Sequence, residues 1–308
     1  MSVLHTVYIV IGLLAFVLNI LVVFRNHLPA QVYNIATFGL GMLPIKGAED
    51  PTTKLPQLVP KRWYTHFYAW GVIWDCCILA YITCVYLGHV PYVLWWVQTA
   101  LTYITGHNIE VVIAEQQWRF ETCQFEVVLA LLLQTLQVMR RVLECVFVTV
   151  FGSNSKMHMI LYLGGYLFYT WNGATILSQL ATCSDGADTK LQLQWYHFTG
   201  VLLFIYASYH QYKCHSILAN IRTGRDSSTY GLPKGDWFEL VTSPHYFAEI
   251  LIYTGIAMVQ GFKNVWTIGP VISTILMLLP GTRLTHEWYM EKHREECSKR
   301  RALFPYIY

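Results

Sequence analysis

Long apolar stretches with few charged side chains constrain the fold of this chain more than any other feature. Residues 1–24 carry none at all, and apolar blocks follow at 64–87, 125–151, 157–180, 193–212, 244–262 and 265–283. Only 13% of the 308 residues are charged, against roughly 25% in an ordinary soluble domain. Because ~20 apolar residues in a helix cross a hydrocarbon core, the sequence predicts an all-α integral membrane protein, a bundle of about seven transmembrane helices.

The remaining apolar segment, Pro91–Ile113, is interrupted by Gly106, His107, Asn108 and Glu110. We expect it to be a shallow, re-entrant or interfacial piece. The whole chain is interpreted as one membrane domain, residues 1–308. Residues 1–62 are expected to form the first helix and a cytosolic loop, residues 63–308 the rest of the bundle, and residues 283–308 a cytosolic tail.

The distribution of basic residues predicts the orientation in the membrane. Lysine and arginine cluster at 46–62, 140–156, 213–234 and 283–301, and basic segments stay on the cytosolic side of membranes. Seven spans then place the N-terminus in the lumen and the C-terminus in the cytosol. No basic residue precedes the first apolar run, so we expect a retained helix and not a cleaved signal peptide. The net charge of +3 is too small to indicate a nucleic-acid partner.

The eight cysteines are scattered, and no C-x-x-C pair occurs. This spacing favours neither a zinc site nor a disulfide framework. We therefore expect free cysteines within the bundle and no metal site.

A polar segment, residues 231–249, lies between two apolar blocks and holds Lys234, Asp236, Glu239, His245 and Glu249. Polar groups at a bilayer boundary are costly to keep without a role. Its two prolines and Gly235 prevent one continuous helix, so we expect a structured loop followed by a helix that begins near Pro244. His245 and Glu249 are four apart and share a face of that helix.

Two arginines interrupt an apolar block at Arg140 and Arg141, with Glu144 one turn later. An arginine inside a membrane helix is expensive unless it faces a partner or a wet cavity, so we interpret this pair as part of a site. The alternative is that both arginines mark a helix end and extend to lipid headgroups.

A polar stripe also runs along the end of the apolar block 193–212 and just beyond it. At ~100° per residue, Gln211, His215 and Arg222 lie within about 40° of one another. A basic stripe at the cytosolic mouth of a bundle suits an anionic ligand, since guanidinium matches phosphate geometry. Contact with lipid headgroups is the competing interpretation.

Common nucleotide and hydrolase motifs are absent from the sequence. It contains no G-x-G-x-x-G, no phosphate-binding G-x-x-x-x-G-K-[ST] and no G-x-S-x-G. His286 and Glu287 begin a zinc-protease pattern, but Met290 stands where the second histidine belongs. A dinucleotide would therefore have to be held by the helix bundle itself, where His286 and Tyr289 share one helix face.

Six motifs in order resemble the steroid 5α-reductase family, and in particular its polyprenol (polyprenal) reductase branch. They cover the chain from about residue 60 to the end. The motifs are Arg140-Arg-Val-Leu-Glu-Cys145, His210-Gln-Tyr-Lys-Cys-His215, Pro233-Lys-Gly-Asp-Trp-Phe-Glu239, Ser243-Pro-His-Tyr-Phe-Ala-Glu249, His286-Glu-Trp-Tyr289 and Arg300-Arg-Ala-Leu-Phe-Pro-Tyr-Ile-Tyr308.

The resemblance implies a multi-pass reductase of the endoplasmic reticulum membrane that uses NADPH. Its substrate would be a polyisoprenoid lipid, a polyprenal or polyprenol whose α-isoprene double bond is reduced toward dolichol for protein N-glycosylation. Membrane lipids are the other expected partners, and no obligate protein partner is implied.

The resemblance also implies the site residues. The cofactor-binding residues carry over onto Arg141, Gln211, His215, Arg222, Tyr230, His245, Glu249 and Tyr289, with Lys234 as a replacement phosphate contact and Asp236 from the third motif. The carbonyl-binding Glu and Tyr of the steroid reductases are not preserved, since Val138 occupies the tyrosine position. Tyr64, His66 and His286 are the candidate catalytic donors instead.

Three alternative functions remain open at this point. One is a 3-oxo-5α-steroid 4-dehydrogenase that acts on 3-oxo-4-ene steroids. Another is a seven-helix carrier or receptor, which would spread polar residues along a path through several spans. The third is an isoprenylcysteine methyltransferase, which would bind S-adenosylmethionine and need no basic contact for a 2′-phosphate.

Overall fold

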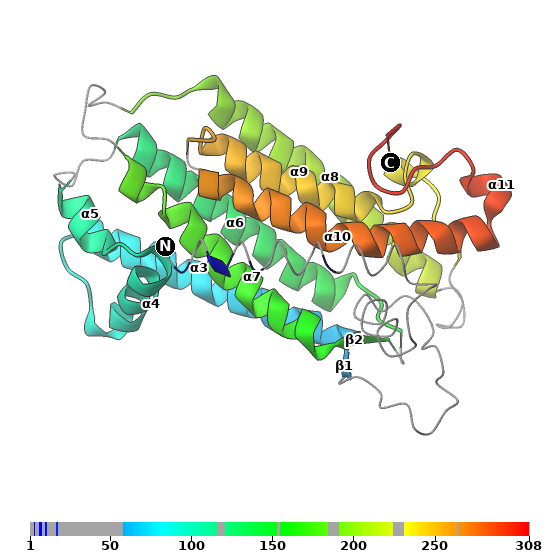
Figure 1. Ribbon diagram of the computed structural model, residues 1–308, viewed down its shortest axis with the longest axis horizontal. Helices are drawn as coiled ribbons and strands as arrows, with labels where there is room; N and C mark the ends of the chain where they lie inside the picture. Colours follow the sequence, from blue (N-terminus) through cyan, green and yellow to red (C-terminus); the bar gives the residue numbers. More distant parts are fainter. Residues whose placement is uncertain are drawn as a thin grey trace.

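Long helices lie side by side and make up most of the computed structural model (Figure 1). The structure describes residues 58–115, 121–152, 155–183, 191–223, 231–263 and 265–307, with positions 3, 6, 7, 10 and 17. The long helices are α3 (Tyr64–Tyr86), α6 (Thr122–Phe147), α7 (Met159–Leu177), α8 (Trp195–Thr223), α9 (Pro244–Val259) and α10 (Val265–Lys292). The all-α prediction is confirmed, whereas most of the expected first helix and Tyr230 lie outside the described residues.

Shorter elements cover the two ends of this bundle (Figure 1). At one end the segment expected to be shallow folds into η3 (Tyr92–Leu94), α4 (Trp95–Thr105) and α5 (Ile109–Glu115). At the other end β1 (Leu58–Pro60) pairs antiparallel with β2 (Lys156–His158), with Val59 opposite Met157. The remaining short helices are η2 (Lys61–Trp63), η4 (Leu180–Thr182), η5 (Asp236–Glu239) and α11 (Arg294–Cys297).

Three helices of the described part are long and apolar enough to cross a membrane, at Lys61–Tyr86, Thr122–Phe147 and Trp266–Lys292. Large apolar side chains remain exposed on the outer faces of other long helices, among them Leu163 on α7 and Leu202 on α8. Lipid is the solvent that such a surface fits. The protein is therefore a membrane protein, and the count of seven spans stays a prediction.

Local sequence explains where several helices begin and end. Glu121 and Gln124 form a reciprocal capping box at the start of α6, which satisfies backbone N–H groups that have no partner in the first turn. Helix α9 begins at Pro244, as predicted. Helix α10 continues to Lys292, beyond the apolar block that ends near Arg283. Arg283 pairs with Glu287 one turn later (3.0 Å), and no glycine or proline follows Gly281 in the helix.

Helices α8 and α9 approach each other closely at two glycines. A Cβ atom added to Gly200 would lie 2.8 Å from the carbonyl oxygen of Gly255, and the reverse distance is also 2.8 Å. Small residues allow such close backbone approach between membrane helices. This contact fixes α8 against α9 and thereby the relative positions of the polar residues that both helices carry.

The prediction of free cysteines is wrong for two of the eight. Cys123, at the start of α6, forms a disulfide with Cys183, which follows η4, while the other six are free thiols. The partners are 60 residues apart in the sequence, so no short motif indicates the pairing. The disulfide lies at the end of α6 opposite Arg140 and Arg141.

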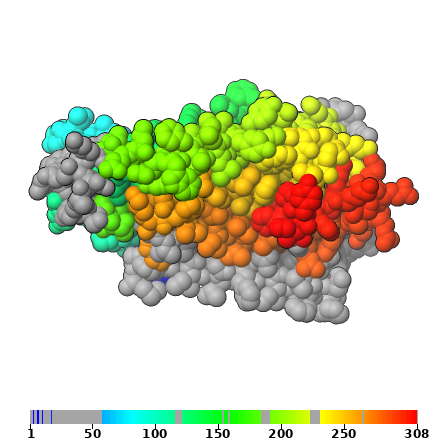
Figure 2. All heavy atoms as spheres, turned by 90° about the horizontal axis from the view of Figure 1, so that it is seen from above, coloured from blue at the N-terminus to red at the C-terminus, as the bar shows by residue number. Residues whose placement is uncertain are grey.

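The C-terminal segment 300–307 packs back onto the loop before α9. Figure 2 shows the C-terminal residues in red against the yellow segment of the chain and α10 in orange. The backbone N–H of Thr242 donates to the carbonyl of Arg301 (2.8 Å), and the N–H of Arg301 donates to Leu240 (2.9 Å). The buried guanidinium of Arg300 donates to the carbonyl of Pro233 (2.8 Å). The polar loop is thus held as the structured element that the sequence predicts.

The glycine contact predicts that Gly255→Val destabilises the bundle. The added side chain would overlap the backbone of Gly200, so we expect a loss of about 1–3 kcal/mol in the free energy of unfolding. Thermal and denaturant unfolding in detergent measure this loss. Leu202→Val, on the exposed face of α8, is the matched control, and equal stability of the two variants would contradict the proposed packing role.

Candidate active site

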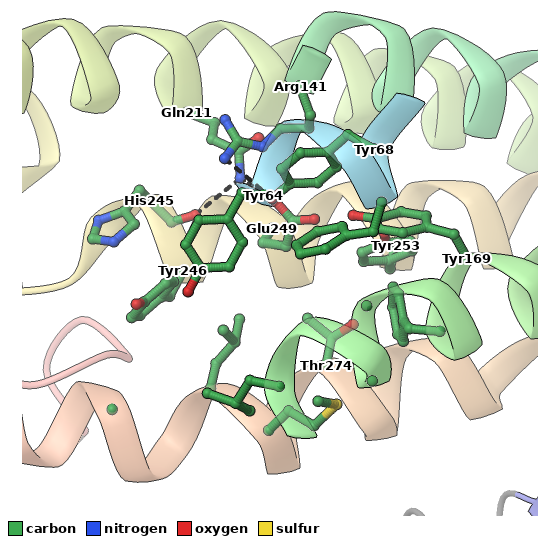
Figure 3. Close-up of a pocket in the computed structure, with 18 of the residues that line it drawn as sticks. Tyr64, Tyr68, Arg141, Tyr169, Gln211, His245, Tyr246, Glu249, Tyr253 and Thr274 are labelled. Atoms are coloured by element: carbon green, nitrogen blue, oxygen red, sulfur yellow. Dashed lines mark hydrogen bonds between the residues drawn. The ribbon is translucent and has the colours of Figure 1, made fainter. Parts of the chain in front are cut away.

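A cavity opens among six helices toward the end of the bundle that carries Arg141, and Figure 3 shows most of its lining. Its empty volume is about 1060 Å³, a figure that includes open space at the mouth. The lining residues are Tyr64, Phe67 and Tyr68 (α3), Arg141 (α6), Leu161, Gly164, Gly165, Phe168 and Tyr169 (α7), Gln211 and His215 (α8), His245, Tyr246, Glu249 and Tyr253 (α9), and Thr274, Met277, Leu278 and Gly281 (α10).

The basic end of the cavity is built around Glu144, whose side chain is 3% exposed. Its carboxylate accepts from the guanidinium groups of both Arg140 and Arg141. Arg141 also donates to the hydroxyl of Tyr68 (3.3 Å) and lies over the Tyr68 ring, 5.1 Å from its centroid. Glu144 therefore provides the partner that two arginines inside a membrane helix require.

His215 joins this cluster from α8. Its Nδ1 lies 2.5 Å from a carboxylate oxygen of Glu144 and 2.8 Å from the guanidinium of Arg141. One imidazole nitrogen cannot donate to a carboxylate and accept from a guanidinium in the same tautomer. The contact to Glu144 is the shorter, so we assign Nδ1 as the donor to that carboxylate and not as an acceptor from Arg141.

A second carboxylate, Glu249, lies farther along the cavity. Gln211 donates its side-chain N–H groups to Glu249 and to the backbone carbonyl of His245 (3.1 Å for the latter). Figure 3 places Glu249 between His245 on one side and Tyr169 and Tyr253 on the other. The cavity thus has an acceptor group beyond its cationic end.

Tyrosines and apolar residues form the rest of the lining. The tyrosines are Tyr64, Tyr68, Tyr169, Tyr246 and Tyr253. Helices α7 and α10 also contribute an apolar wall that includes Leu161, Phe168, Met277 and Leu278. The cavity therefore combines a cationic end, phenolic O–H donors and a surface suited to a hydrocarbon chain.

The structure brings six of the residues predicted for the site to this cavity. They are Tyr64, Arg141, Gln211, His215, His245 and Glu249. Their helical spacing in the sequence indicated part of this arrangement, because His245 and Glu249 share a face of α9, and Gln211 and His215 share a face of α8.

Six other predicted residues lie outside the cavity lining, and each has partners elsewhere. His66 contacts Tyr162 (3.2 Å), and His286 contacts Thr242 (3.3 Å). Arg222 donates to the carbonyl of Val150 (2.5 Å). Tyr289 is 4% exposed and packs against Trp288. Asp236 contacts Nδ1 of His210 (2.8 Å). Lys234 pairs with Glu296, and this hydrogen bond lowers the pKa of that carboxyl. Tyr230 is not among the described residues.

The sequence analysis missed several residues of the site. Tyr68 follows Tyr64 by four residues, a spacing that could have identified it as a neighbour on the same helix face. Tyr246 and Tyr253 flank Glu249 on α9 but carried no signal, since an aromatic residue in a membrane helix is most often packing. Gln137, which contacts Glu249 (3.4 Å), is three residues before Arg140.

The lining residues fit a phosphorylated cofactor. Among the described residues, the buried Nδ1 of His245 and Nε of Arg141 have no hydrogen-bond partner, and buried polar atoms without a partner are rare unless a ligand or water meets them. Guanidinium and imidazole donors suit phosphate oxygens. No group of His, Cys, Asp and Glu suitable for a metal ion occurs in the part of the chain that the structure describes.

The charge cluster predicts that Glu144→Gln destabilises the protein. The substitution leaves two guanidinium groups inside the bundle without their counterion, and we expect a loss of about 3 kcal/mol in the free energy of unfolding. Denaturant unfolding in detergent checks this value. Glu287→Gln, which removes the partly exposed pair with Arg283, is the control, with an expected loss under about 1 kcal/mol. Similar losses in both variants would refute the role of Glu144.

Comparison with known proteins identifies the family. Residues 155–308 match the model of the 3-oxo-5-alpha-steroid 4-dehydrogenase family. The chain is 38% identical over 258 residues to a protein of Xenopus tropicalis named polyprenal reductase, with 81% of this chain and 80% of the relative covered. It is 32% identical to the Homo sapiens protein of that name (81% and 78% covered) and 27% identical to polyprenal reductase 1 of Arabidopsis thaliana (81% and 82% covered). The chain therefore belongs to the 3-oxo-5-alpha-steroid 4-dehydrogenase family, the steroid 5α-reductases, whose members are oxidoreductases.

Proposed function

We propose that this protein is an NADPH-dependent reductase of the α-isoprene double bond of polyprenal, on the route from polyprenol to dolichol. The observation that carries the proposal is the cavity that joins the guanidinium of Arg141, whose side chain is 12% exposed, to a wall of apolar residues on α7 and α10. A phosphorylated cofactor and a hydrocarbon chain can meet in such a cavity. Similarity to proteins named polyprenal reductase over about four fifths of both chains supports the same choice of substrate.

Reduction of an enal needs a hydride at the β-carbon, a hydrogen-bond donor at the carbonyl oxygen and a proton at the α-carbon. NADPH, when bound, supplies the hydride. We assign the carbonyl donor to the hydroxyl of Tyr64, because it lies in the cavity lining, whereas the other two candidates, His66 and His286, do not. The phenol of Tyr68, which lines the same cavity, is the candidate proton source.

Five residues of the lining are proposed to hold the cofactor. Arg141 suits phosphate oxygens, and His215, His245 and Gln211 offer polar atoms to the ribose or the carboxamide. Glu249 is a carboxylate that repels phosphate, so it suits an N–H donor. Arg222, Tyr230, Lys234, Asp236 and Tyr289 remain proposals that rest on the sequence patterns and the family resemblance.

Steroid reduction is the second candidate function. It is favoured by the family model, whose description names a 3-oxo-5-alpha-steroid 4-dehydrogenase. Both reactions need the same cofactor-binding end of the cavity. They differ in the shape that the apolar wall must fit, which is a long flexible chain in one case and a rigid ring system in the other. A carrier or receptor would spread basic and acidic residues along a path through several spans, whereas Arg140, Arg141 and Glu144 cluster at one end of α6.

A reductase assay with purified protein in lipid tests the proposal. We expect NADPH oxidation with polyprenal and formation of the saturated aldehyde, with little turnover of polyprenol or of a 3-oxo-4-ene steroid. Products are identified by mass spectrometry. Turnover of the steroid alone would assign the second function, and absence of NADPH binding by folded protein would refute both.

The same assay tests Tyr64. Tyr64→Phe removes only the hydroxyl, so we expect kcat to fall by at least about tenfold, as when one donor to a developing oxyanion is lost, with NADPH affinity unchanged. Tyr166→Phe, which removes a phenol outside the cavity lining, should retain normal kcat. Full activity of Tyr64→Phe would exclude this residue as the donor.

We also propose that the protein resides in the endoplasmic reticulum membrane with its N-terminus in the lumen and its C-terminus in the cytosol. The positions of the basic residues support this orientation. The disulfide Cys123–Cys183 gives independent support, since it lies at the end of α6 away from Arg141, and disulfides persist in oxidising compartments such as the lumen.

Cysteine labelling in sealed microsomes tests the orientation. Tyr306→Cys and Tyr103→Cys place thiols at exposed positions near opposite ends of the bundle. A membrane-impermeant maleimide should label position 306 in intact vesicles and position 103 only after permeabilisation, relative to the parent chain. The reverse pattern would overturn the orientation.

A further inference from the structure

We propose that Arg140 is a positioning residue for the nicotinamide end of the cofactor, acting on Glu249 through Gln137 and Gln211. The inference rests on the proposed use of NADPH. Although Arg140 and Arg141 are neighbours in sequence, only Arg141 lines the cavity. Successive residues of a helix point ~100° apart. Arg140 therefore does not face the cavity and is turned toward Gln137 and Gln211.

The guanidinium of Arg140 contacts three acceptors at once. One terminal nitrogen donates to Glu144. The other donates to the side-chain oxygen of Gln137 (2.6 Å) and to the side-chain oxygen of Gln211. The planar fork of arginine, with several N–H donors in a fixed geometry, suits this arrangement better than the single ammonium of lysine.

These contacts determine which way both glutamine amides point. A guanidinium only donates and a carboxylate only accepts. The amide oxygens of Gln137 and Gln211 must therefore face Arg140, and their N–H₂ groups face Glu249. Gln211 donates to Glu249 directly, and the amide nitrogen of Gln137 lies 3.4 Å from each of its two oxygens. Arg140 does not need to touch Glu249 to hold its carboxylate in place.

The held carboxylate is at the point where the two parts of the cavity meet. Glu249 lies between His245, toward the cationic end, and Tyr169 and Tyr253 (Figure 3). A carboxylate repels phosphate and has no hydrogen to donate to it, whereas it readily accepts a hydrogen bond from a carboxamide N–H₂. We therefore infer that Glu249 meets the carboxamide of nicotinamide, and that Arg140 determines how well it does so.

The affinities for two ligands distinguish a positioning role of Arg140 from a direct phosphate contact. NADPH carries nicotinamide, and 2′-phospho-ADP-ribose carries the same phosphates without it. For Arg140→Met we expect the affinity for NADPH to fall by about tenfold, the loss that accompanies one charge-assisted hydrogen bond, while the affinity for 2′-phospho-ADP-ribose stays within about twofold of the parent. Arg140→Lys keeps the charge without the fork, and it should restore little of the NADPH affinity.

Gln137→Met provides a second route, because Gln137 is outside the cavity lining and its loss removes one link between Arg140 and Glu249. It should reproduce the ligand-selective effect, and the double variant with Arg140→Met should lose less than the product of the two single losses. This variant also keeps the inference testable if Arg140→Met fails to fold.

Four outcomes would overturn the inference. Equal losses for both ligands would make Arg140 a phosphate contact or a purely structural residue. Full recovery in Arg140→Lys would mean that only the charge matters, and multiplicative effects in the double variant would mean that Arg140 does not act through Gln137. If the parent protein binds 2′-phospho-ADP-ribose as well as NADPH, the nicotinamide contact is absent. Failure of the parent to bind either ligand would instead refute the proposed function.

Discussion

The structure depends on one constraint, which is that charges inside a membrane bundle need partners. Arg140 and Arg141 lie on an otherwise apolar helix, and a lone guanidinium there is costly. Glu144 resolves this cost one helical turn away by accepting from both arginines. His215 joins from α8, so the cluster ties α6 to α8 and determines where the cationic end of the cavity forms.

The other functional groups of the cavity are arranged around this cluster. Arg141 and His215 face the cavity, Glu249 provides an acceptor farther in, tyrosines provide O–H donors, and α7 and α10 provide a wall for a hydrocarbon chain. A membrane enzyme that binds a charged cofactor and a lipid in one cavity needs this gradient from cationic to apolar. The bundle supplies it without a separate nucleotide-binding domain in the described part of the chain.

Much of this arrangement could be predicted from the sequence, because it is encoded at short range. Apolar blocks predicted the long helices, Pro244 marked the start of α9, and four-residue spacings placed His245 near Glu249 and Gln211 near His215. Contacts between distant segments carried no such signal. The pairing of Cys123 with Cys183 and the meeting of Gln137, Gln211 and Glu249 arise only when the helices pack. Helical spacing and the resemblance also placed Arg222 with Gln211 and His215, and Tyr289 with His286. Both residues lie outside the cavity lining, because spacing along one helix does not determine how far from the cavity a residue lies.

The central claim is that the cationic end of this cavity holds the phosphorylated part of NADPH while Glu249 meets its nicotinamide. Cryo-electron microscopy of the full chain in lipid nanodiscs with NADPH tests it most directly. The account predicts cofactor density that fills the cavity from Arg141 and His215 to Glu249, with the nicotinamide ring facing the wall formed by α7 and α10. Density at the surface of the bundle, with Arg141 still turned toward Glu144 and the cavity empty, would contradict it.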